Sequence, residues 1–342
     1  MKAVRFHEYG GVDKLRYEDA PDPVISDNEA LVRVRACSLN RLDIWARMGT
    51  RKEHVPMPHI SGSDISGEID RTGKLVTGHE KGEKILVSPG ISCGICEYCT
   101  TSRDSLCPSY KIIGYETQGG YAEYVAVPRE NLLQIPDELS FEEASSIPLV
   151  FLTAWHMLVT RARTAPGESV LVWAAGSGVG SAAVQVSKLL GAKVIATVGS
   201  EQKMEKAKAL GADHVINHHS ADVPEEVKRL TNGEKVHVVF DHVGTATWEK
   251  SMRSMAPGGR LVNCGVTSGG KAEIDIRYVF VRQFSLLGCY MGGRGELLQV
   301  LKFFEYGRLR PVVDSVFPLK DAAKAQERME KNEHFGKIVL KV

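Results

Sequence analysis

The sequence contains no long apolar run and no excess of charge of either sign. Its apolar stretches stay well short of the roughly 18 residues that cross a membrane as a helix, and its start, MKAVRFHEYGG, lacks the apolar segment of an export signal. The 43 Lys and Arg residues balance 42 Asp and Glu residues, so we expect no electrostatic attraction to nucleic acid or to an anionic membrane. Repeats and low-complexity segments are also absent. Collagen-like, disordered, secreted miniprotein and membrane classes are therefore excluded, and we expect a cytoplasmic protein.

The length and the pattern of apolar residues indicate two domains. At about 150 residues per domain, 342 residues are enough for two sizeable cores. The first third contains short β segments such as Ala30–Ala36, separated by glycine and proline, which is typical of a barrel-like β domain. From Val170 onward, continuous apolar strands alternate with amphipathic helices, which indicates a parallel sheet covered on both faces. We therefore predict an α/β protein in which a β-barrel domain is joined to a doubly wound domain.

A run of small residues, AAGSGVG, connects the strand VLVWA at Val170–Ala174 to the helix expected at Val179–Leu190. Small residues at this place let the backbone approach a pyrophosphate, whose charge the helix N-terminus then stabilises. The pattern G-x-G-x-x-G is incomplete, because Ser181 stands at the third glycine position. The alternative is a tight turn that only packs a helix on the sheet. The strand–turn–helix context favours dinucleotide binding, with contacts from Gly176, Ser177, Gly178, Val179 and Gly180.

The end of the following strand, KVIATV at Lys193–Val198, indicates which dinucleotide is bound. A carboxylate there would accept a hydrogen bond from the adenosine 2′-hydroxyl and would repel a 2′-phosphate. The strand tip, TVGS, has no acidic residue, and Lys203 follows shortly after it. Gly199 leaves space for a phosphate, Ser200 can donate a hydrogen bond to it, and Lys203 can neutralise it, unless Lys203 merely faces solvent. We therefore predict NADP(H) in preference to NAD(H).

Four of the seven cysteines are clustered, in CGICEYC and at Cys107. Four thiolates complete the tetrahedral coordination of Zn²⁺ and leave no position for water or substrate, so such a site is structural. An iron–sulfur cluster also takes four cysteines, but the seven-residue gap before Cys107 does not fit the ferredoxin pattern. Four unrelated free thiols are the other alternative. We predict one structural zinc per subunit, bound by Cys93, Cys96, Cys99 and Cys107.

Further segments carry a family resemblance, among them GGYAEYVAVP at Gly119–Pro128, IPLVFLTAW at Ile147–Trp155 and GGRLVNCGV at Gly258–Val266. With the four-Cys segment and the glycine turn, the sequence resembles the medium-chain dehydrogenase/reductase superfamily, which includes the zinc alcohol dehydrogenases and the quinone reductases. The resemblance covers nearly the whole chain. It implies a chaperonin-10-like β-barrel catalytic domain at residues 1–149 and 288–342, with a zinc lobe at 90–110, and a doubly wound Rossmann nucleotide-binding domain at 150–287.

The resemblance fails at the ligands of the catalytic zinc that alcohol dehydrogenases of this superfamily carry. Aligned through Asp43, the first Cys ligand is replaced by Asn40. The His and Glu of the family's Gly-His-Glu motif are replaced by Ser63 and Asp64, and the later Cys ligand falls near Leu149. Because three ligands of the nitrogen and sulfur set are missing, we expect no catalytic zinc. Asn40 resembles the asparagine beside the nicotinamide in zinc-free quinone reductases, and Asn40, Ser63 and Asp64 are the candidate catalytic residues.

The resemblance also assigns the remaining cofactor contacts and an activity. Thr153 would lie against the nicotinamide, and Val243 and Gly265 would line the cofactor site. The implied activity is NADP(H)-dependent hydride transfer to or from an apolar carbonyl or alcohol, without a catalytic zinc. The alternatives are a quinone or enone reductase and, from another class, a non-enzymatic nucleotide- or RNA-binding relative. We expect a small-molecule substrate and a homo-oligomer, either dimer or tetramer, with no nucleic acid or membrane partner.

Overall fold

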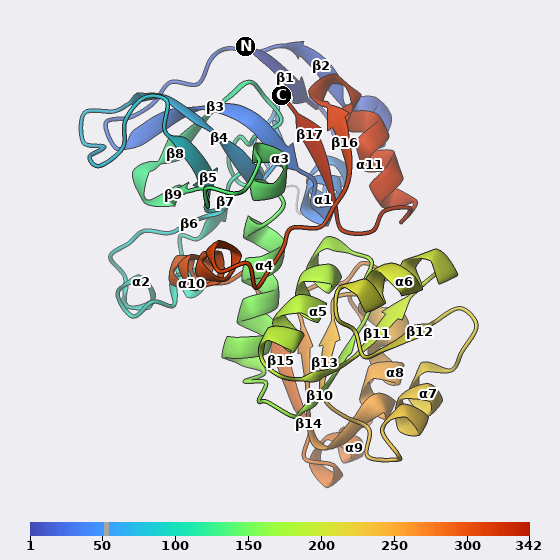
Figure 1. Cartoon of the computed structure of the whole chain (residues 1–342). Helices are drawn as coiled ribbons and strands as arrows, with labels where there is room; N and C mark the ends of the chain where they lie inside the picture. Colours follow the sequence, from blue (N-terminus) through green and yellow to red (C-terminus); the bar gives the residue numbers. More distant parts are fainter. Residues whose placement is uncertain (51–54) are drawn as a thin grey trace. The chain divides into compact units, whose positions relative to one another are not determined.

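The computed structural model describes residues 1–50 and 55–342, which divide into two compact units (Figure 1). Unit 1 comprises Met1–Leu149 and Gly293–Val342, and unit 2 comprises Val150–Gly292. The chain returns to unit 1 at Gly293, whereas the sequence predicts the return at residue 288. The difference arises because β15 (Ser285–Gly288) is a strand of the unit 2 sheet and the Cys289 amide still donates to the carbonyl of Asn263, at 2.8 Å.

Within its described residues, unit 1 is built on a seven-stranded sheet with the order β16-β17-β3-β4-β5-β9, and β8 also pairs with β3. The long strand β3, with the sequence EALVRVRACS, alternates buried Val32, Val34 and Ala36 with more exposed Arg33 and Arg35, as a half-buried strand requires. The strands are β3 (Glu29–Ser38), β4 (Asp64–Thr72), β5 (Lys84–Val87), β8 (Tyr124–Pro128), β9 (Leu132–Gln134), β16 (Val313–Pro318) and β17 (Lys337–Lys341).

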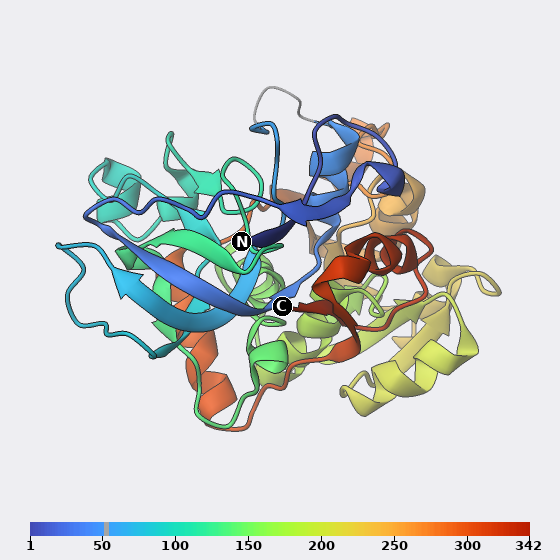
Figure 2. The ribbon, with the colours of Figure 1, turned by 90° about the horizontal axis from the view of Figure 1, so that it is seen from above.

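The C-terminal strand β17 pairs antiparallel with β3 near the end of the chain (Figure 2). Val339 lies opposite Ser38, and the Leu39 amide donates to the carbonyl of Ile338 at 2.8 Å. This register places the first residue of β17, Lys337, beside the point where β3 gives way to helix α1 (Arg41–Met48). Two segments that are far apart in the sequence thereby meet at Asn40.

The other elements of unit 1 surround this sheet. The C-terminal helix α11 packs against β17 and β16, and the short helix α3 packs against β3 and β4. The remaining strands are β1 (Lys2–Arg5), β2 (Arg16–Asp19), β6 (Gly90–Ile91) and β7 (Lys111–Ile112). The helical segments are η1 (Val12–Lys14), α2 (Glu97–Thr100), η3 (Asp104–Leu106), η4 (Arg129–Asn131), α3 (Phe141–Ala144), α10 (Arg294–Glu305), η6 (Leu319–Asp321) and α11 (Ala322–Glu330).

Unit 2 has a parallel sheet with the order β12-β11-β10-β13-β14-β15. All four residues of β10 are buried, as expected for a strand covered on both faces. Because crossovers between parallel strands are right-handed, the strand order places α5 and α6 on one face and α7 and α8 on the other. The strands are β10 (Ser169–Val172), β11 (Lys193–Val198), β12 (His214–Asn217), β13 (Val236–Asp241), β14 (Met255–Asn263) and β15. The helices are α5 (Gly178–Leu189), α6 (Glu201–Ala209), α7 (Val223–Leu230), α8 (Thr245–Ser254) and α9 (Ile276–Val281).

The helical stretch expected from Phe141 onward is interrupted at the proline, as predicted. Helix α3 ends at Ala144, and α4 (Pro148–Trp155) begins with Pro148 at a position that lacks an intrahelical N–H partner in any helix. The π-helical turn η5 (His156–Arg161) continues α4. Among the described residues, no helix has the length and apolar character needed to cross a membrane. The α/β fold, with a barrel-type unit and a doubly wound unit, is as predicted.

Candidate active site

The residues predicted to bind the cofactor follow the strands of unit 2 at one edge of the sheet. The four strands concerned, β10, β11, β13 and β14, are parallel, so their carboxyl ends meet at the same edge. The glycine turn follows β10, at the position where the strand order reverses between β10 and β13, which is where open α/β sheets bind ligands. The residues after the other three strands are Gly199, Val243 and Gly265, while Thr153 is a buried residue of α4.

The glycine turn is held by local contacts that require its small residues. Ser177 caps α5, and its Oγ accepts a hydrogen bond from the Gly180 amide at 2.9 Å. A Cβ added at Gly180 would lie 2.4 Å from the carbonyl oxygen of Ala174, so only glycine permits this approach of the helix to the strand end. Ala174 itself has a positive φ of 48°. The turn thus aims the N-terminus of a twelve-residue helix outward at the sheet edge, where it can bind an anion.

Two histidine side chains lie against Gly199 at the tip of β11. A Cβ at Gly199 would lie 3.1 Å from His219 Nε2 and 3.4 Å from His218 Nε2, and the two imidazole centroids are 4.5 Å apart. Burial lowers the pKa of His218, and the charges of His219, Lys250 and Lys203 lower it further. One exposed carboxylate, that of Glu201, begins α6 two residues later. The sequence alone does not indicate these two histidines, because they follow the next strand, β12, and come close to Gly199 only through the pairing of β12 with β11.

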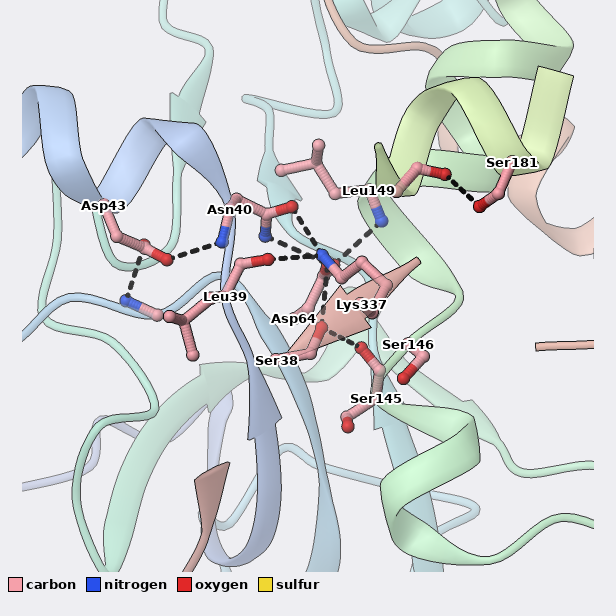
Figure 3. Close-up of polar contacts among 12 residues, drawn as sticks. Ser38, Leu39, Asn40, Asp43, Asp64, Ser145, Ser146, Leu149, Ser181 and Lys337 are labelled. Carbon is pink, nitrogen blue, oxygen red and sulfur yellow. Dashed lines mark hydrogen bonds and ion pairs between the residues drawn. The ribbon is translucent and has the colours of Figure 1, made fainter. Parts of the chain in front are cut away.

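A buried polar cluster in unit 1 joins Asn40, Asp64 and Lys337 (Figure 3). The Lys337 Nζ lies 2.6 Å from Asn40 Oδ1, 2.7 Å from the carbonyl oxygen of Leu39 and 2.8 Å from Asp64 Oδ2. Asn40 Nδ2 donates to Asp64 Oδ2 at 3.0 Å, and the Leu149 amide donates to Asp64 Oδ1 at 2.8 Å. The exposed fractions are 0 % for Asp64, 3 % for Lys337 and 6 % for Asn40, so Asn40 is the member that retains a little accessible surface.

This cluster occupies the positions at which the resemblance places a catalytic zinc. Asn40, Ser63 and Leu149 stand where the ligands would be, and they offer one amide, one hydroxyl and no side-chain donor atom. Zinc sites in proteins use thiolate, imidazole and carboxylate ligands. The carboxylate that belongs to the cluster, that of Asp64, is already paired with the Lys337 ammonium. The residues present therefore do not fit a catalytic zinc.

Ser63 and Asp43 flank the cluster. Ser63 is fully buried, and its Oγ makes no hydrogen bond to any described residue. Asp43 accepts hydrogen bonds from the Asn40 amide at 2.7 Å, from the Tyr121 hydroxyl at 3.0 Å and from the Gly62 amide at 3.2 Å. Burial nevertheless raises the pKa of Asp43 to about 6. Asp43 thus links the start of α1 to the loop before β4 and fixes the backbone of Asn40 through the hydrogen bond from its amide.

The four clustered cysteines form a second potential cation site in unit 1. Their sulfur atoms all lie within 4.8 Å of one another, and Cys99 Sγ is 3.5 Å from Cys96 Sγ and 3.9 Å from Cys93 Sγ. A tetrahedral zinc with bonds of about 2.3 Å to sulfur requires sulfur–sulfur distances of about 3.8 Å. Backbone N–H groups of Ile95 and Cys96 lower the pKa of Cys93 to about 6, which favours the thiolate that binds metal. The cysteine lobe therefore fits a four-coordinate zinc.

Family models match both units of the chain. Residues 26–137 match the alcohol dehydrogenase GroES-like domain, and residues 178–306 match the zinc-binding dehydrogenase family. A glycine turn on a Rossmann-type sheet and a GroES-like barrel define a nucleotide-dependent oxidoreductase. The chain belongs to the medium-chain dehydrogenase/reductase superfamily, as the resemblance predicted.

Individual relatives are similar over all or nearly all of their length. A solved structure of an NAD-dependent alcohol dehydrogenase shares 46 % identity and a TM-score of 0.97, covering 100 % of each chain. The NAD-dependent alcohol dehydrogenase of Sulfolobus acidocaldarius is 32 % identical, also over 100 % of each chain. The quinone oxidoreductase of Pongo abelii is 29 % identical over 96 % of this chain and 94 % of its own. The relatives thus include both reaction types that the sequence analysis leaves open.

Proposed function

We propose that this chain is an NADP(H)-dependent oxidoreductase that transfers hydride to or from an apolar carbonyl or alcohol without a catalytic zinc. The observation that supports the missing metal is the Asn40–Asp64–Lys337 cluster, in which a buried ammonium is hydrogen-bonded by the groups that stand at the ligand positions. A lysine nitrogen held in this way competes with any metal for Asp64. The zinc of this protein is then the structural one, bound by the four cysteines of the lobe.

The cofactor supplies the chemistry, since its nicotinamide donates or accepts the hydride. The residues of this chain bind and orient the reactants. The N-terminus of α5 and the glycine turn would stabilise the pyrophosphate of the bound cofactor, and Thr153 of α4 would contact its nicotinamide, as the resemblance implies. Asn40 donates a hydrogen bond from Nδ2 to the substrate oxygen or to the nicotinamide amide. Asp64, which is fully buried and hydrogen-bonded on both oxygens, supports Asn40 without touching the substrate.

A quinone or enone is the second substrate class that these residues favour. Asn40 offers a neutral hydrogen-bond donor, which stabilises a full alkoxide charge far less than a metal ion does. In a quinone or enone, conjugation spreads the charge that follows hydride addition, so a neutral donor suffices. The similarity to a quinone oxidoreductase supports this alternative.

The proposal for NADP(H) rests on the tip of β11. Gly199 has no side chain, so the backbone at the strand tip stays uncovered, and the imidazoles of His219 and His218 lie against it and add hydrogen-bonding groups near Ser200 and Lys203. These groups favour a 2′-phosphate, which NADP(H) carries and NAD(H) lacks. Two of the relatives are named NAD-dependent, so the cofactor preference of this chain has to be measured. The kcat/KM values for NADPH and NADH decide between the two, and we expect NADPH to be preferred.

A substitution at Gly199 sharpens the cofactor test. Gly199→Asp places a carboxylate beside the 2′-position, so it should reduce kcat/KM for NADPH by about tenfold or more and raise the relative use of NADH. Gly295→Asp is the matched control, because a Cβ at Gly295 meets no atom within 4 Å and the residue lies in α10 of unit 1. A wild-type protein that uses both cofactors equally, or prefers NADH, would contradict the proposal.

The substrate class is tested by NADPH consumption with a panel of quinones, enones, aromatic ketones and primary alcohols. We expect turnover with the conjugated compounds and little with ethanol. Asn40→Ala should lower kcat/KM, because the loss of one hydrogen bond to a reacting group raises the activation free energy by roughly 1–3 kcal/mol. Nucleotide binding with no turnover on any compound would favour a non-enzymatic binding protein.

We also propose that the protein is a homo-oligomer. Strand β15 lies at the edge of the unit 2 sheet, and nearby α9 exposes the apolar side chains of Ile276, Phe280 and Val281. An exposed apolar patch of this kind is typical of a protein–protein interface. Light scattering should give the mass of a dimer or tetramer, and a monomer at micromolar concentration would contradict this proposal.

A further inference from the structure

We propose that Lys337 is a positioning residue, whose ammonium fixes the orientation of the Asn40 side-chain amide (Figure 3). The inference deepens the proposed function, in which Asn40 donates a hydrogen bond to the substrate or to the nicotinamide. Lys337 does not itself touch either of them. It acts by leaving the Asn40 amide one orientation, with a single N–H free to donate.

Each of the three N–H groups of the Lys337 ammonium has a hydrogen-bond acceptor. It carries three protons, and the structure gives it three acceptors, the carbonyl oxygen of Leu39, Asn40 Oδ1 and Asp64 Oδ2, at 2.6–2.8 Å. A lysine side chain has no acceptor. With 3 % of its surface exposed, Lys337 has no proton or surface left for a ligand, so its role is structural toward its neighbours.

The contact with Lys337 decides which way the Asn40 amide points. Only Oδ1 can face an ammonium, because a flipped amide would set an NH₂ group against three N–H donors. Nδ2 therefore faces Asp64, and one of its two hydrogens is donated to Oδ2 at 3.0 Å. The structure records no acceptor for the second Nδ2 hydrogen among the described residues. This hydrogen is the donor that remains for a ligand.

The charges of the cluster also strengthen that donor and keep it in place. A cation at Oδ1 draws electron density from the amide and makes its remaining N–H a better donor, as in other chains of polarised hydrogen bonds. Asp64 cannot turn away, since the Leu149 amide binds its other oxygen at 2.8 Å. Lys337 thus polarises the Asn40 amide through Oδ1, and its ion pair with Asp64 keeps that amide in place.

A double-mutant cycle tests this inference. Lys337→Met alone leaves the Asp64 carboxylate buried and unpaired, so the working variant is the pair Lys337→Met/Asp64→Asn, which removes both charges. The one amide oxygen that replaces the carboxylate can accept either from the Leu149 amide or from Asn40 Nδ2, so the Asn40 amide is no longer held in a single orientation. We expect the pair to lower kcat by about tenfold in the Asn40 protein, with little change in KM, because the donor acts on charge that develops in the transition state. In an Asn40→Leu background the same pair should change kcat less than about twofold.

A matched control and a second measurement separate positioning from general stability. Lys341→Met removes a lysine from the same strand, but its side chain is 67 % exposed and pairs with Glu142, so kcat should not change. Selective ¹⁵N labelling of asparagine makes the side-chain amide of Asn40 visible by NMR, with its assignment given by loss of the signal in Asn40→Leu. We expect the pair variant to shift this resonance and to speed rotation of the amide, and Lys341→Met to leave it unchanged.

Two results would overturn the inference. One is an equal loss of kcat from the pair variant with and without Asn40, and the other is an Asn40 amide resonance that the pair variant leaves unchanged. The NMR measurement needs no substrate, so it decides the role of Lys337 even if NADPH turnover is found with no compound. That last outcome would count against the proposed function alone.

Discussion

Unit 1 contains two clusters of electron-rich atoms that suit a cation, and the cations that suit them differ in origin. In the cysteine lobe, four sulfur atoms lie within 4.8 Å of one another, at the spacing of a zinc site. In the Asn40–Asp64–Lys337 cluster, oxygen atoms surround a nitrogen of the chain itself. A metal ion can be removed by a chelator, whereas a lysine cannot. The comparison supports the proposal that one barrel holds a metal for stability in its cysteine lobe, while a lysine of the chain stands at the position where the resemblance places a second metal.

The largest expected effect comes from breaking the cysteine lobe. Cys99→Ala removes one of four ligands, and the remaining three cannot close a tetrahedral site. Because metal binding contributes directly to the stability of such lobes, we expect zinc to be lost and residues 90–110 to become susceptible to proteolysis. Elemental analysis and limited proteolysis measure both effects.

The control for this variant is Cys264→Ala, which lies outside the lobe. Its thiol has a pKa raised to about 12 by burial, so it does not compete for metal at neutral pH. Zinc content should stay at the wild-type value in this variant. Retention of full zinc content in Cys99→Ala would contradict the assignment of the lobe.

The next effect comes from removing the cation of the second cluster. Lys337→Met leaves Asp64 charged, buried and without an ion partner, which typically costs about 3–5 kcal/mol of unfolding free energy. Adding Asp64→Asn should recover most of that loss, because no buried charge remains. Urea unfolding of the single and the double variant measures the difference. Equal stability of the two variants would mean that Asp64 is not held by Lys337.

The smallest effect concerns Asp43, the carboxylate beside the cluster, for which the described residues provide no ion partner. Burial raises its pKa from 3.8 to about 6, so the folded protein binds this proton more tightly than the unfolded chain does. The contribution of Asp43 therefore lowers stability as the pH rises from about 4 to about 6, by at most about 1.4 kcal/mol per pH unit. Above about pH 6 the contribution is constant.

The Asp43 effect is measured as a difference between the wild type and Asp43→Asn, which has no proton to release. Unfolding free energies at several pH values should diverge between the two proteins only in this window. A difference that does not change with pH would show that Asp43 titrates in its ordinary range.

Much of the fold follows from local sequence patterns. The alternation in β3, the buried run of β10 and the small residues up to Gly180 each specify their own structure within a short window. The spacing of the four cysteines likewise predicts a metal site without any long-range contact. The return to unit 1 is expected at residue 288 from the sequence and lies at Gly293 by the division into compact units, a difference of five residues that local patterns do not resolve.

The candidate site depends on contacts between distant residues, which local patterns do not contain. Lys337 lies 273 residues from Asp64, and the pairing of β17 with β3 brings them together. The one indication in the sequence is the lysine that opens the strand KIVLK, where a charged residue precedes three buried apolar ones. Similarly, His218 and His219 reach Gly199 through pairing of β12 with β11. Their role could be inferred only after the strand order was known.

The measurement that tests the central claim most directly combines zinc content with turnover during chelation. The account predicts about one zinc per chain, held by the four cysteines, and NADPH-dependent turnover that survives a brief exposure to chelator for as long as the lobe stays folded. About two zinc ions per chain, with turnover lost on brief chelation while the circular dichroism spectrum is unchanged, would contradict it. That result would place a metal where the structure has Asn40, Asp64 and Lys337.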